Sequence, residues 1–167
     1  MDEDSKAKLR RYNRNIEISG MAMIFYAYWS VVKFFAPIVI GGTNAAEYIG
    51  IDMNDYLANK ALAWIAVVLT LGILFSVYYF LGKSAVKYAR GKKRRKGFIV
   101  YAAIVFLVTA IGMIDYPEEL LKIRHISDAD SVVASFVVDL TLLFMLFDMM
   151  YSTIRGSKFR KMEEQMT

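Results

Sequence analysis

The stretch from residue 61 to residue 96 decides the fold, because an apolar run leads directly into a cluster of basic residues. It reads ALAWIAVVLTLGILFSVYYFLG (61–82) and then KSAVKYARGKKRRK (83–96). The first part has 22 residues and no Asp, Glu, Lys or Arg. A helix needs about 20 apolar residues to cross the ~30 Å hydrocarbon core of a bilayer. The sequence therefore predicts a membrane-spanning helix that is followed by a polybasic loop.

Three further apolar runs lie on either side of this stretch, at residues 18–40, 98–114 and 131–151. Apolar residues make up 57% of the chain, above the ~45–50% of an average soluble domain. We therefore expect an all-α integral membrane protein whose residues 1–167 form a single domain, a four-transmembrane-helix bundle with spans at 18–40, 61–82, 98–114 and 131–151.

The distribution of Lys and Arg predicts the orientation of the bundle. Of the 21 basic residues, five precede the first span, eight lie in loop 83–97 and four follow the last span. Only three lie in loops 41–60 and 115–130, and one lies inside the first span. Because basic residues gather on the cytoplasmic side, we expect an N-in/C-in topology with loops 41–60 and 115–130 outside. This bias fits a bacterial or archaeal plasma membrane.

Lys33 and Asp139 are charged residues inside predicted spans, where charges are costly and often mark functional sites. At ~1.5 Å per residue, each lies roughly 10–12 Å below the outer boundary, on different helices. We therefore expect a Lys33–Asp139 ion pair. The pair either fixes the packing of the first and fourth spans or relays an ion or proton. Alternatively, Lys33 reaches the outer interface without a partner.

A polar stripe runs along the inner half of the fourth span. Its members are Thr141, Asp148, Ser152 and Arg155, at helical spacings of seven, four and three. We expect Asp148 to pair with Arg155 or with a residue of the basic loop near the inner surface. An interfacial salt bridge is favoured there over a functional role.

The core of the polybasic loop is predicted to contact anionic lipid headgroups. Its residues are Lys92, Lys93, Arg94, Arg95 and Lys96. A basic residue next to an anionic membrane surface contributes ~1 kcal/mol of attraction. No aromatic side chain is interleaved among the five, as a base-stacking surface requires, so we expect no nucleic-acid partner.

The sequence offers no recognisable catalytic or metal-binding pattern. There is no cysteine, and the single histidine, His125, lies in a loop without a repeated ligand spacing. The segment that begins at Asp52 resembles a calcium loop at first but has Leu57 where that loop needs glycine. We therefore expect no catalytic residue, no metal and no cofactor.

Two classes of function remain for a small bundle of this kind. The first is a non-enzymatic membrane protein that binds another membrane protein, or itself, as an accessory, assembly or immunity-type subunit. The alternative is a small oligomeric channel or transporter that uses Lys33, Asp139 and Asp148. A lipid-modifying enzyme, in which the basic loop presents a headgroup to Asp148, is disfavoured because nothing else supports it.

Overall fold

The computed structural model describes residues 3–40, 60–92, 97–115, 117 and 126–164. These residues form α1 (Glu3–Ile40), α4 (Lys60–Ala89), α5 (Phe98–Gly112), the short 3₁₀ helix η1 (Met113–Asp115) and α7 (Ile126–Glu164). In the described part of the chain, all regular secondary structure is helical and there is no β-strand. The prediction of an all-α fold is therefore confirmed.

Three helices, α1, α4 and α7, are long and apolar enough to cross a membrane. The candidate spanning segments lie within Glu3–Phe35, Trp64–Ala89 and Val133–Arg160. α5 is a shorter apolar helix of 15 residues. These helices are those of a membrane-embedded protein, and the described residues contain three candidate spans where the sequence predicted four.

α1 and α7 are much longer than the apolar runs that predicted them. They contain 38 and 39 residues, so each is about 57 Å long at 1.5 Å per residue, nearly twice the ~30 Å hydrocarbon core. α1 begins at Glu3, well before residue 18, and α7 continues to Glu164, well past residue 151. α4 likewise continues to Ala89, into predicted loop 83–97. Hydropathy marks residues that suit lipid, and a helix can continue beyond them.

The first turns of α1 are stabilised by charges in favourable positions. Glu3 and Asp4 lie in the first turn, where the helix dipole favours negative charge. Lys8 follows Asp4 by one turn, and its Nζ lies 2.6 Å from Asp4 Oδ2. This polar stretch therefore continues the helix without contributing to the apolar run.

The chain divides into two compact units. Unit 1 comprises Met1–Ala22 with Leu81–Thr167, and unit 2 comprises Met23–Phe80. In unit 2, aromatic pairs join α1 to α4. The rings of Tyr26 and Tyr78 meet edge-on with centroids 4.8 Å apart, and another edge-on pair joins these helices at 5.3 Å. Such pairs add ~0.5–1.5 kcal/mol beyond their buried area.

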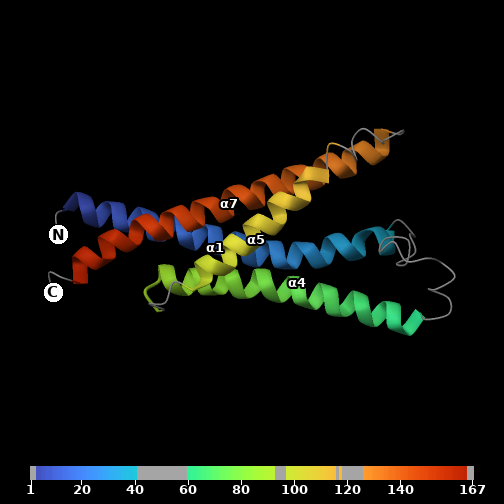
Figure 1. Cartoon of the computed structure of the whole chain (residues 1–167), viewed down its shortest axis with the longest axis horizontal. Coiled ribbons are helices and arrows are strands. Elements are labelled where there is room, and N and C mark those ends of the chain that lie inside the picture. Colours follow the sequence, from blue (N-terminus) through green and yellow to red (C-terminus); the bar gives the residue numbers. More distant parts are fainter. Residues whose placement is uncertain (1–2, 41–59, 93–96, 116, 118–125, 165–167) are drawn as a thin grey trace. The chain divides into compact units, whose positions relative to one another are not determined.

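In unit 1, α5 packs against α7, and the first turns of α1 lie at the same end as the last turns of α7 (Figure 1). One stripe of α7 is buried and faces its neighbours. It consists of Leu142, Leu146, Met149, Thr153 and Gly156, spaced alternately by four and three residues. This spacing keeps one side of a helix against its neighbours over several turns.

A second stripe of α7 faces outward and is apolar over a length that matches a bilayer. Its exposed residues are Val133, Val137, Leu140, Phe144, Phe147, Tyr151 and Ile154. At 1.5 Å per residue the stripe is about 32 Å long, and the exposed Lys158 follows it. On α1 the exposed side changes likewise, from Arg10 and Arg14 to Ile18. We call the end of unit 1 that carries these charges the basic end.

Candidate functional site

The predicted partners Lys33 and Asp139 belong to different units. Lys33 lies on the part of α1 in unit 2 and is exposed, and Asp139 lies on α7 in unit 1 and is half-buried. Each of the two side chains has interactions within the molecule. The ion pair between them stays a prediction.

Asp148 forms a polar cluster with two serines. Its carboxylate accepts hydrogen bonds from Ser19 Oγ on α1 and from Ser152 Oγ on α7, each at 3.4 Å. Both serines are buried, whereas Asp148 is half-buried. Hydrogen bonds of 3.4 Å are long and therefore weak. The cluster links α1 to α7 near the charged end of the apolar zone.

The other two members of the polar stripe are exposed and make different contacts. Thr141 Oγ1 donates to the carbonyl oxygen of Val137 at 2.8 Å, a local bond along the helix. The Arg155 guanidinium lies over the ring of Tyr151, 5.6 Å from its centroid. Of the four residues of the polar stripe, the structure therefore brings together Asp148 and Ser152, and it adds Ser19 from α1.

Four described helices of unit 1, α1, α4, α5 and α7, meet around Arg160 and Tyr88. The guanidinium of Arg160, on α7, lies 4.4 Å from the ring centroid of Tyr88 on α4 and donates to the Tyr88 carbonyl oxygen at 3.4 Å. It also donates to Asn13 Oδ1 on α1 at 2.9 Å. The buried Tyr88 ring contacts Phe98, near the start of α5, at 5.4 Å between centroids. Arg160 and Tyr88 therefore join the ends of four helices.

The Tyr88 carbonyl belongs to the C-terminal turn of α4, which explains why it accepts an arginine. Gly91 has φ +73°, in the left-handed region that glycine adopts without strain. Its N–H donates to Tyr88 O at 3.1 Å, and the Lys92 N–H donates to Lys87 O at 2.9 Å. These two bonds define a Schellman motif. Carbonyls at a helix C-terminus favour a cation, and Arg160 supplies it from α7.

Two glycines allow α1 to approach its neighbours closely. A Cβ atom on Gly20 would lie 3.0 Å from the backbone oxygen of Gly82 and 3.1 Å from Ala85 Cβ, both on α4. A Cβ atom on Gly156 of α7 would lie 3.1 Å from Tyr12 Cβ on α1. Small residues of this kind let backbones pack closely where lipid offers no hydrophobic drive for association.

The basic loop follows the C-terminal turn of α4, next to the contacts of Arg160 and Tyr88. Arg90 Nη2 lies 2.7 Å from Glu17 Oε1 on α1, in a salt bridge at the surface. Lys92 is exposed. The four other predicted lipid contacts, Lys93, Arg94, Arg95 and Lys96, lie outside the described residues, so that site stays a prediction.

Within the described residues, no group of three or more His, Cys, Asp or Glu side chains is placed to hold a metal ion. His125 lies outside the described residues. No protein-family model, curated protein or solved structure matches this chain. The inferences about function therefore depend on the residues and their geometry.

The junction around Arg160 was not predicted from the sequence. Arg160 is one of the four basic residues that follow the last predicted span, and the sequence assigns Tyr88 no site. The signal that was available is local: Gly91 follows Tyr88 by three residues, as a helix C-terminal turn requires. Nothing in one sequence indicates which cation from another helix meets that turn.

Proposed function

We propose that the chain is a four-span membrane protein with both termini in the cytoplasm, and that it acts by binding another membrane protein. The observation that carries the proposal is the direction of its side chains. In unit 1, the polar groups near the charged end of the apolar zone bond to one another, as Asp148 does with Ser19 and Ser152. The outward faces of the helices carry large apolar side chains, which suit contacts with lipid or with another membrane helix.

The length of α5 together with η1 supports a fourth span. Fifteen α-helical residues at 1.5 Å and three 3₁₀ residues at ~2.0 Å extend about 28 Å, close to the ~30 Å core. Ile104, Leu107, Val108 and Ile111 on α5 are each more than half exposed. A short helix with an apolar outer face is expected where lipid surrounds it.

Cysteine labelling tests the topology cleanly, because the chain contains no cysteine. The single variants are Ser5→Cys, Thr43→Cys, Ser127→Cys and Ser157→Cys. We expect a membrane-impermeant maleimide to label positions 43 and 127 in intact cells, and positions 5 and 157 only after permeabilisation. The opposite labelling pattern would mean that both termini lie outside the cell. Labelling of positions 43 and 157 from the same side, with position 127 on the other, would contradict four spans.

Photo-crosslinking in the native membrane tests binding to another membrane protein. A photoreactive residue replaces Phe25, Ile73, Leu107 or Phe144, one exposed apolar position on each helix. We expect a discrete protein adduct from one helix face, with only lipid adducts from the others. An adduct with twice the chain's mass would identify self-association. The proposal fails if all four positions give only lipid adducts in cells whose membrane contains the protein.

Permeation is the alternative, and the half-buried Asp148 with its long hydrogen bonds is the observation in its favour. Ion and proton flux into liposomes that contain the wild type or Asp148→Asn separates the two proposals. Flux that Asp148→Asn abolishes would favour a channel or transporter. We expect no flux from either protein, and an Asp148→Asn variant that is only less stable.

A further inference from the structure

Unit 1 carries a basic patch on α1 and α4, formed by Arg10, Arg14, Lys83 and Lys87. All four side chains are exposed. Each helix contributes two residues at a spacing of four, so the two members of each pair lie on the same side of their helix. The patch contains none of the predicted lipid contacts at residues 92–96, and it consists only of helical residues.

Two contacts hold the helices that carry the patch next to each other. Gly20 of α1 packs against the backbone of α4, and Glu17 of α1 forms a salt bridge with Arg90 of α4. Glu17 follows Arg14 by three residues, and Arg90 follows Lys87 by three. Arg14 and Lys87 therefore lie about one turn from this salt bridge, each on its own helix. The Glu17 carboxylate is already paired with Arg90.

An exposed apolar surface continues from the patch along α1. Ile18 and Met21 follow Arg14 by four and seven residues, so they share its side of the helix, and they are 55% and 49% exposed. Basic side chains that border exposed apolar ones match the chemistry of a phospholipid, whose phosphate is anionic and whose acyl chains are apolar. A soluble acidic partner would not need the apolar part.

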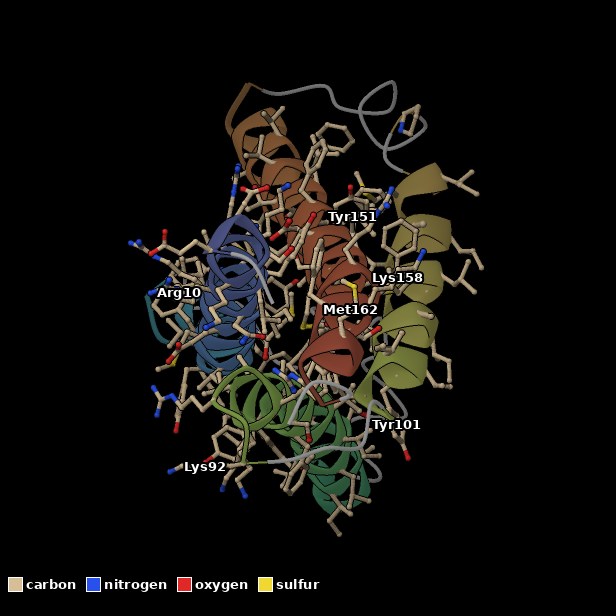
Figure 2. All side chains as sticks on the ribbon, turned by 90° about the vertical axis from the view of Figure 1, so that its left-hand side faces the viewer. Arg10, Lys92, Tyr101, Tyr151, Lys158 and Met162 are labelled. Atoms are coloured by element: carbon tan, nitrogen blue, oxygen red, sulfur yellow. The ribbon has the colours of Figure 1, made fainter. Side chains whose placement is uncertain are left out.

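We propose that Arg14 and Lys87 of the basic patch bind the headgroup phosphate of an anionic phospholipid, with the acyl chains against Ile18 and Met21. Figure 2 shows Arg10 of α1, and Lys92 just after α4, on one side of the unit. Lys158 of α7 lies on the other side. The exposed basic residues of α7 therefore provide a matched control, since they carry the same charge on a different side. The proposal does not depend on which face of the membrane the basic end occupies.

Native mass spectrometry in neutral detergent tests the site with phosphatidylglycerol and with phosphatidylcholine of the same chains. We expect the first phosphatidylglycerol to bind more tightly than phosphatidylcholine. Attraction of the size measured for basic residues at anionic membranes corresponds to about fivefold in affinity per residue. Arg14→Gln with Lys87→Gln should therefore weaken phosphatidylglycerol binding by about 25-fold and leave phosphatidylcholine unchanged. The control, Arg155→Gln with Lys158→Gln, should change it less than threefold.

Equal weakening by the two double variants would mean a diffuse charge effect and would overturn the proposal, as would an unchanged affinity in Arg14→Gln/Lys87→Gln. If that variant does not fold, the single variants Arg14→Gln and Lys87→Gln should each weaken phosphatidylglycerol binding about fivefold and are judged by the same comparison. Glycerol 1-phosphate is the competitor that separates a lipid from a free phosphate. We expect it not to displace the lipid at millimolar concentration, and complete displacement would assign a soluble phosphate instead.

Discussion

Replacing Gly20 with alanine tests the closest approach of two helices in unit 1. The new Cβ atom would lie 3.0 Å from a backbone oxygen of α4 and 3.0 Å from Val86 Cγ2, tighter than ordinary van der Waals contact. Overpacking of this kind costs about 1–3 kcal/mol. Alanine also favours a helix over glycine by about 0.5–1 kcal/mol. We therefore expect Gly20→Ala to lower the free energy of unfolding by about 1–2 kcal/mol.

Gly72→Ala is the matched control, because Gly72 lies inside α4 and a Cβ atom there would meet nothing within 4 Å. It gains the same helix propensity without the clash, so the difference between the two variants isolates the packing cost. Unfolding is followed by circular dichroism in mixed micelles with a rising fraction of sodium dodecyl sulfate. If Gly20→Ala stabilises the protein as much as Gly72→Ala does, α1 and α4 do not touch at Gly20.

Three further predictions use the same unfolding measurement. Arg160→Gln should cost about 1–3 kcal/mol, because it removes a charge-assisted hydrogen bond and a cation–π contact. Lys158→Gln removes an exposed charge on the same helix and should change stability by less than about 0.5 kcal/mol. An equal loss of stability in both variants would contradict the contacts of Arg160 with Asn13 and Tyr88. Gly91→Ala should cost about 1 kcal/mol because its φ is +73°, and a gain in stability would rule out the left-handed turn. Glu17→Gln should cost less than about 1 kcal/mol, since the Glu17 and Arg90 side chains are 36% and 47% exposed. This loss of stability should vanish near about 1 M salt, because salt screens exposed charges. A larger, salt-independent loss would indicate a buried pair.

The helices were predictable because their apolar runs are long, but their ends were not. The apolar runs of α1 and α7 stop near Glu17 and Tyr151, where side chains no longer need to suit lipid. The helices continue because residues such as Asp4 and Lys8 pair along the helix, and neither residues 3–17 nor residues 152–164 contain a proline. Hydropathy responds to lipid exposure, so it predicts the apolar part of each helix. Helix continuation depends on local hydrogen bonds and charges, so the helix ends were not predicted.

The candidate site divides in the same way. Asp148 and Ser152 could be placed together because they are four residues apart on one helix. The Ser19 partner and the meeting of Arg160 with Tyr88 depend on how helices far apart in sequence align, and a single sequence contains no signal for that alignment. The Lys33–Asp139 pair required an alignment of the same kind, from two estimated depths, and it stays a prediction.

The continuation of α1 and α7 beyond their apolar runs also explains why unit 1 holds together at its basic end. Inside lipid, burying an apolar side chain between helices gains little, because lipid tails are equally apolar. Leu9 and Tyr88 lie past the point where the exposed sides of their helices become charged, and both are buried. Where water reaches, burying such a side chain stabilises by about 1.5–3 kcal/mol. The basic end therefore adds hydrophobic burial to the close packing at Gly20 and the hydrogen bonds of Arg160, and the extended helices are what place these contacts together.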